Sequence, residues 1–209
     1  MTNTIKSIYK SYKNIILISL LSIPIGIAVG TIDALFGTVL LKITDFRDAY
    51  PLYLIPFLAL SGILIVFVYN KLGKNSIKGM NLIFEAGHGY EDNIPLRLIP
   101  LVISGTWLTH LFGGSAGREG VAVQIGAALS HITGKKLHFK NSHDIFIVTG
   151  ISAGFSGLFG TPIAAVFFAI EILTAGTLKY TALLPAFISA FTSSTVAGMW
   201  GLEKFKFPL

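Results

Sequence analysis

The sequence predicts an all-α, polytopic membrane protein whose helices are in part broken and re-entrant. The first indication is composition, since 53% of the 209 residues are hydrophobic and only 12% are charged, with a mean hydropathy of +0.72. Soluble domains usually carry about 25% charged residues. The second indication is that full-length apolar stretches alternate with shorter ones interrupted by glycine and proline, a pattern typical of transporters and channels with discontinuous helices.

The first predicted span covers residues 14–41 and is interrupted only by Asp33. It is preceded by a basic segment, residues 1–13, which the positive-inside rule places in the cytoplasm. The apolar run is too long for the core of a signal peptide and shows no small-residue cleavage motif, so we expect it to remain as a membrane helix. Asp33 is either a proton relay or a buried partner of a backbone group.

A second predicted span follows at residues 49–69, after a short charged loop at 42–48. Residues 70–78 then carry three lysines. Two crossings place this second basic cluster on the same side as the N-terminus and the 42–48 loop outside.

The remaining predicted helices are shorter and less regular. The stretch 121–132 has about 12 residues, too few to cross a bilayer alone. Two breaks resemble each other, 113–120 and 154–162, and Pro162 suits the first turn of the helix that it opens. We expect helices from about residue 14 to about residue 200, in a single membrane domain 1–209. The segments after the second span are 79–85, 94–112, 121–132, 144–159, 163–173 and 180–200.

The break Gly113-Gly-Ser-Ala-Gly-Arg-Glu-Gly120 is the strongest functional signal. Glycine lets a backbone approach a ligand closely, and the helix that follows begins with free N–H groups and a positive dipole end, which favour anions. Irregular backbone at membrane depth is tolerated where it is buried in protein or lines a cavity. The segment therefore predicts an anion site with a titratable carboxylate, Glu119, beside it.

These residues resemble the signature of the CLC family of chloride channels and anion/proton exchangers. The matching segments are Gly117-Arg118-Glu119-Gly120-Val121, Gln124-Ile125-Gly126, Gly150-Ile-Ser-Ala-Gly154, Phe159-Gly-Thr-Pro162 and Phe167-Phe-Ala-Ile-Glu171. The resemblance covers about residues 14–200 and implies the first of the two inverted repeats of a CLC-type fold. It also implies that Glu119 occupies an anion position, swings away when protonated, and thereby links proton movement to anion movement.

Three departures from the common family pattern point to its fluoride-handling CLC-F branch. Val121 stands where a proline is usual, and Met80 stands where the anion loop usually carries a serine. Ile172 replaces the second acid of the chloride/proton exchangers, so their internal proton path does not carry over. The resemblance implies the following anion-binding residues: Gly79, Met80, Asn81, Gly117, Arg118, Gly120 and Val121. Met80 could instead be a packing residue, Asn81 a helix cap, and Arg118 a structural cation.

The chain matches only the first half of a CLC subunit. Topology then requires an inverted partner, since an isolated half would leave helix ends with unsatisfied backbone groups facing lipid. We expect either a fragment or split gene product that pairs with a second half-repeat chain, or a homodimer that supplies the missing half. The other expected partners are fluoride or chloride, protons and the bilayer of the cell membrane.

The leading functional hypothesis is fluoride/proton antiport with Glu119 as gating and proton-carrying glutamate. Passive chloride conduction on the same scaffold and a half-length, non-transporting fragment or regulatory partner are the alternatives. An intramembrane serine protease built on Ser115 would leave Glu119 unexplained, so we expect no enzyme. The five histidines show no zinc spacing, and we expect no metal, no cofactor and no nucleic-acid partner.

Overall fold

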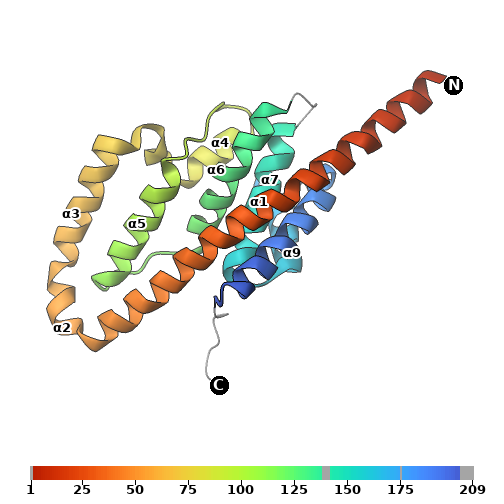
Figure 1. Ribbon diagram of the computed structural model, residues 1–209. Helices are drawn as coiled ribbons and strands as arrows, with labels where there is room; N and C mark the ends of the chain where they lie inside the picture. Colours follow the sequence, from red (N-terminus) through yellow and green to blue (C-terminus); the bar gives the residue numbers. More distant parts are fainter. Residues whose placement is uncertain (1, 138–141, 175, 203–209) are drawn as a thin grey trace.

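The computed structural model describes residues 2–137, 142–174 and 176–202, with side chains from residue 13 onward. All regular elements in this part of the chain are helical (Figure 1). Three helical stretches are long and apolar enough to cross a membrane, Lys13–Ala49, Pro51–Gly87 and Tyr180–Met199. The α-helices are α1 (Thr2–Ala49), α2 (Pro51–Leu54), α3 (Leu58–Val68), α4 (Met80–Gly87), α5 (Leu98–Leu111), α6 (Glu119–Lys136), α7 (Ser142–Phe159), α8 (Pro162–Ile172) and α9 (Leu183–Met199).

Helix α1 is longer than the sequence predicted, and the expected loop at 42–48 is wrong. The helix begins at Thr2 and continues to Ala49, through both the basic N-terminal segment and the charged residues after the apolar run. Arg47 and Asp48 form an exposed ion pair at 2.7 Å within its last turn. Charged side chains are compatible with a helix that continues beyond the apolar layer, so their appearance did not mark its end.

The centre of the molecule is a bundle in which α6 packs along α7, while α9 packs against both α1 and α7 (Figure 1). Glycines allow this close packing, because a Cβ atom on Gly150 or Gly154 of α7 would overlap backbone oxygens of α6. Gly26 and Gly30 of α1 meet α9 in the same way. The pairs Gly26/Gly30 and Gly150/Gly154 are therefore close helix contacts, as their four-residue spacing predicts.

Helices α2 and α3 form a separate arm that lies beside α5, away from this bundle (Figure 1). The break between them is a 3-10 turn at Ile55–Phe57, with Pro51 and Pro56 in the first turns of the two elements. The expected loop at 70–78 is also helical, as one π turn and one 3-10 turn, Tyr69–Gly73 and Lys74–Lys78. Ser61 is the one buried residue of α3 among the described side chains.

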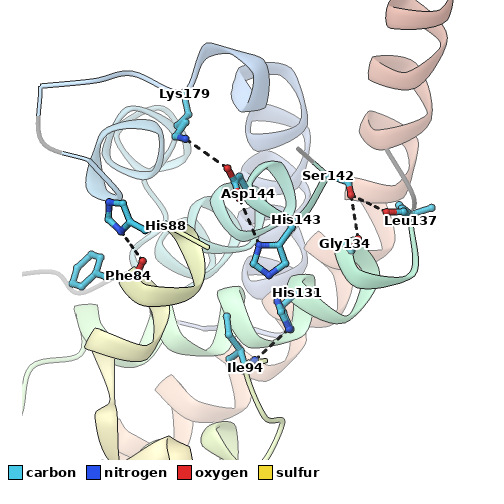
Figure 2. Close-up of polar contacts among 10 residues, drawn as sticks. All are labelled: Phe84, His88, Ile94, His131, Gly134, Leu137, Ser142, His143, Asp144 and Lys179. Atoms are coloured by element: carbon cyan, nitrogen blue, oxygen red, sulfur yellow. Dashed lines mark hydrogen bonds and ion pairs between the residues drawn. The ribbon is translucent and has the colours of Figure 1, made fainter. Parts of the chain in front are cut away.

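Polar contacts fasten the start of α7 to the end of α6 (Figure 2). Ser142 donates to the Leu137 and Gly134 carbonyls at 2.8 and 3.3 Å. His131, which is almost fully buried, accepts a hydrogen bond from the backbone N–H of Ile94 through Nε2 at 3.2 Å. These contacts hold α6 and α7 against each other. The hydrogen bond from Ile94 to His131 also anchors the segment that leads into α5.

Candidate functional site

The glycine-rich break before α6 is held by contacts to its neighbours. Gly113 adopts φ +84° and packs against Ile55, a conformation that favours glycine. The N–H of Gly114 donates to the Thr109 carbonyl at 2.8 Å. The His110 ring lies 3.1 Å from the Ala116 carbonyl through Nε2. These contacts hold the loop against the end of α5 and direct the chain into α6 at Glu119.

The segment before α4 is fixed in a comparable way. Gly79 has φ +55°, so the chain turns sharply out of the 3-10 turn and starts α4 at Met80. Lys78, next to this turn, forms ion pairs with Glu85 at 2.6 Å and with Glu91 at 3.4 Å. The inner face of α4 is buried, so the helix start is held from both sides; its buried residues are Leu82, Ile83, Ala86 and Gly87.

The starts of α4 and α6 meet. The position of a Cβ on Gly120 would lie 3.6 Å from Cγ and 3.8 Å from Sδ of Met80. The corresponding position on Gly79 lies 3.9 Å from Oε1 of Gln124. The structure thus brings together Gly79, Met80 and Gly120, which the sequence placed in two separate motifs.

Neither helix start carries a side-chain cap. Gly79 precedes α4 and Arg118 precedes α6, and neither of these two residues caps its helix through a side-chain hydrogen bond. Uncapped N–H groups and the positive ends of two dipoles therefore converge at one place. That arrangement favours an anion.

Glu119 is the first residue of α6, and its side chain is exposed on the surface of this chain. Its Oε2 lies 3.2 Å from the position that a Cβ on Gly117 would take. A side chain at 117 would therefore crowd the carboxylate, and glycine leaves it room beside the loop. The carboxylate sits at the positive end of the α6 dipole, a place that favours anions.

The other predicted site residues take different positions. The Val121 side chain is buried in the core at 3% exposure, so only its backbone faces the helix start. Asn81 is exposed, in the first turn of α4, and does not cap that helix. Arg118 is half-buried immediately before Glu119.

Gln124 is a site residue that sequence reasoning treated only as part of a motif. Its Nε2 donates to the Gly120 carbonyl at 2.9 Å, and its Oε1 faces Gly79. The sequence signal that could have identified it is a glutamine one helical turn after Gly120 in an otherwise apolar stretch. In the structure this side chain is only 7% exposed. Its side chain therefore lies where the starts of α4 and α6 meet.

Comparisons with known proteins agree with this arrangement. The profile of the voltage gated chloride channel family matches residues 61–207. A protein of Pseudomonas syringae pv. tomato named chloride/fluoride channel protein is 36% identical over 179 residues, which are 85% of this chain and 39% of that protein. An uncharacterised protein of Methanocaldococcus jannaschii is 28% identical over 171 residues, 79% of this chain and 42% of that protein.

Two solved structures share the fold. The crystal structure of a CLC-type fluoride/proton antiporter is 49% identical with a TM-score of 0.89, over 95% of this chain and 50% of that one. A slow cyanobacterial chloride/proton antiporter is 20% identical with a TM-score of 0.68, over 88% of this chain and 46% of that one, and it shows the fold alone. The chain spans half or less of the length of each of these four proteins. It belongs to the CLC family, the family of voltage gated chloride channels, as a membrane protein with the fold of that family's first half.

Proposed function

We propose that this chain provides one half of an anion transporter that exports fluoride in exchange for protons. The observation that carries the proposal is the convergence of two uncapped helix starts at Met80 and Gly120, with the Glu119 carboxylate at the same place. The sequence identity of 49% to a protein described as a CLC-type fluoride/proton antiporter supports the choice of ion.

In this proposal Glu119 is the gate and the proton carrier. As a carboxylate it occupies the positive end of α6 and excludes the permeant anion, because both compete for the same potential. Protonation removes the charge of Glu119 and weakens its attraction to the N–H groups, so that an anion can take its place. The exposed position of the side chain leaves it free to move.

The remaining residues of the proposed anion site act mainly through the backbone. Gly117, Gly120 and Val121 offer N–H groups at the start of α6, and Asn81 does so at the start of α4. The Gly79 N–H already donates to the Ser76 carbonyl at 3.1 Å, so Gly79 contributes through its positive φ, which turns the chain into α4 beside the site. Met80 borders the site with its thioether, and Arg118 adds positive potential from half-buried surroundings. Met80 stands at the position where the anion loop of the family usually carries a serine hydroxyl.

We place the chain in the cell membrane with its N-terminus in the cytoplasm, as a single membrane domain. The exposed carboxylate and helix starts require a second inverted half to enclose them. We propose that the rest of a longer protein, a second half-repeat chain or a second copy supplies it.

The test is transport in liposomes under opposed fluoride and proton gradients. We expect a reversal potential that depends on both ions, and Glu119→Gln should abolish proton movement while leaving some anion leak. Glu171→Gln is the matched control, since that exposed acid lies at the end of α8 and should leave coupling intact. Proton coupling that survives in Glu119→Gln would remove Glu119 from this role.

Passive anion conduction is the second candidate, and the relative named chloride/fluoride channel protein favours it. A reversal potential that follows the anion gradient alone, at every pH difference, would establish a channel and exclude exchange. A third candidate is a non-transporting half that regulates a full-length relative, since the chain spans half or less of its relatives. Absence of flux from the chain alone, together with altered flux when it is co-reconstituted with a full-length relative, would favour that role.

A further inference from the structure

Asp33 is the one acidic residue that is fully buried in the described part of the chain, and it lies in the middle of α1. Both carboxylate oxygens are enclosed and neither has a hydrogen-bond partner among the described residues. No ion pair in that part of the chain includes Asp33. An ionised carboxylate enclosed without a partner is strongly disfavoured.

Ser193 of α9 has the matching property. Its Oγ is also buried without a partner among the described residues. The position of a Cβ on Gly157 of α7 would overlap both Ser193 Oγ and Asp33 Oδ2, so the two unpartnered groups border the same point. Gly30, one turn before Asp33, lets the Ser193 backbone approach α1 closely. Three helices thus bring an orphaned carboxyl and an orphaned hydroxyl together.

The elements that enclose Asp33 carry few titratable side chains at its level. The part of α7 at this level, residues 150–159, and the whole of α9 contain no titratable side chain. Helix α5, which also packs on α1, brings His110, and the start of α6 brings Arg118 and Glu119. A neutral carboxyl has one O–H donor, and a serine oxygen can accept it. The serine hydroxyl can also donate to an ionised carboxylate, but that bond would leave the buried charge unbalanced, whereas one added proton removes the charge and keeps the pair bonded.

The packing of α6 on α7 shows where Asp33 and Ser193 lie along the helix axes relative to Glu119. Gly126 of α6 faces Gly150 of α7, and Ala122 of α6 faces Gly154 of α7, so the two helices are antiparallel. Four residues toward the start of α6 therefore correspond to four residues toward the end of α7. One further turn places Glu119 level with Gly157. Asp33, which contacts Gly157, therefore lies level with Glu119 along the axes of α6 and α7.

We propose that Asp33 is a second proton-binding carboxyl of this membrane domain, which holds its proton in a hydrogen bond to Ser193 at the level of Glu119. This places one protonated acid inside the helix bundle, level with a more exposed one at the anion site. It also gives the chain an internal proton site although Ile172 replaces the second acid seen in chloride/proton exchangers.

Infrared spectroscopy of the protein in lipid tests the proposal without any transport measurement, so its outcome is independent of the proposed function. At neutral pH we expect a carbonyl stretch of a protonated carboxyl, above the amide band, that is lost in Asp33→Asn. Asp45→Asn is the matched control, an exposed acid on the same helix, and should remove carboxylate bands instead. Ser193→Ala should keep the protonated band and shift it to higher frequency, because its acceptor is gone.

Loss of carboxylate bands in Asp33→Asn, in place of the protonated band, would overturn the proposal. If Asp33→Asn does not fold, Ser193→Ala decides alone. A protonated band that shifts supports the site, and a spectrum without a protonated band, or with one that Ser193→Ala leaves in place, rejects it.

Discussion

Helix α1, which belongs to the bundle of α1, α6, α7 and α9, and the arm of α2 and α3 have about equally apolar windows, yet they are packed in opposite ways. In the most apolar window of the first span 39% of the residues are buried, whereas in the stretch Pro51–Gly87 the figure is 6%. In the bundle, glycines bring backbones into direct contact, while Gly62 of α3 has no atom within 4 Å of the position of a Cβ. Hydrophobicity therefore indicates the membrane, and close glycine contacts indicate the core.

The largest expected effect contrasts one glycine from each region. In Gly150→Ala the new methyl group would overlap the Gly126 carbonyl and Ser130 Oγ, and we expect the free energy of unfolding to fall by about 3 kcal/mol, the upper range for overpacking. Gly62→Ala should be neutral or stabilising by up to about 1 kcal/mol, because alanine favours helix. Unfolding in detergent followed by circular dichroism measures both, and equal losses would refute the contrast.

A second prediction concerns the link between α5 and the bundle. Trp107 Nε1 donates to the Phe36 carbonyl of α1 at 3.2 Å, and the two rings stack with centroids 6.2 Å apart. Trp107→Phe should cost about 1 kcal/mol, the net value of one hydrogen bond. Trp200→Phe is the control, since Trp200 is 67% exposed. The same unfolding assay applies, and an unchanged stability would mean that α5 is held by other contacts.

A third, smaller effect separates hydrogen bonds between helices from those within one helix. Ser156 of α7 donates to the Ala190 carbonyl of α9 at 2.8 Å. Ser104 of α5 donates to the Pro100 carbonyl of its own helix at 2.7 Å. We expect Ser156→Ala to cost about 0.6 kcal/mol, the average for bonds between membrane helices, and Ser104→Ala to cost less. The reverse order in chemical unfolding would contradict the assignment of the core to α7 and α9.

The smallest effect lies at the polar end of the bundle, outside the three candidate spans. The His143 ring and then Lys179, which lies 3.6 Å from Asp144, lower the pKa of Asp144 (Figure 2). A lowered pKa stabilises the fold above the pKa of the unfolded chain and loses that contribution as pH falls through the folded pKa. Asp144→Asn should cost about 0.3 kcal/mol at neutral pH, as exposed pairs do.

The measurement for this pair is the unfolding midpoint of wild type and Asp144→Asn as a function of pH. The difference should disappear at acid pH, and Lys179→Gln should cost little further in the Asp144→Asn background. A difference that grows as the pH falls would mean that the pair does not stabilise the fold.

The sequence predicted the helix breaks well, because glycine and proline act locally. Pro162 opens α8, and the break before Glu119 opens α6. It failed at helix ends, where Asp45 and Arg47 were assigned to a loop although they continue α1. Helix α6 was predicted at 121–132, about 12 residues, and has 18, because Glu119 and Gly120 at its start and residues 133–136 at its end also belong to it.

The sequence predicted the individual motifs of the candidate site but not the contacts between them. Each motif was visible in the sequence, whereas the contact of Met80 with Gly120 depends on how α4 lies against α6, which no local pattern encodes. Asp33 shows the same limit, because its burial next to Ser193 joins residues 160 positions apart. The roles of the site residues remain predictions for the transport experiments above.

Helix α1 has 48 residues, which at about 1.5 Å per residue make a rod of about 72 Å. The hydrocarbon layer is only about 30 Å thick, and even a strong tilt of about 40° would not contain such a length. Several turns of this helix therefore lie outside the hydrocarbon layer. Spin labels placed one residue at a time along the lysine-bearing first part of α1 would show at which residue the environment changes from water to lipid. The rise per residue then gives the depth of Asp33 in the membrane, and the packing of α6 on α7 relates Glu119 to it.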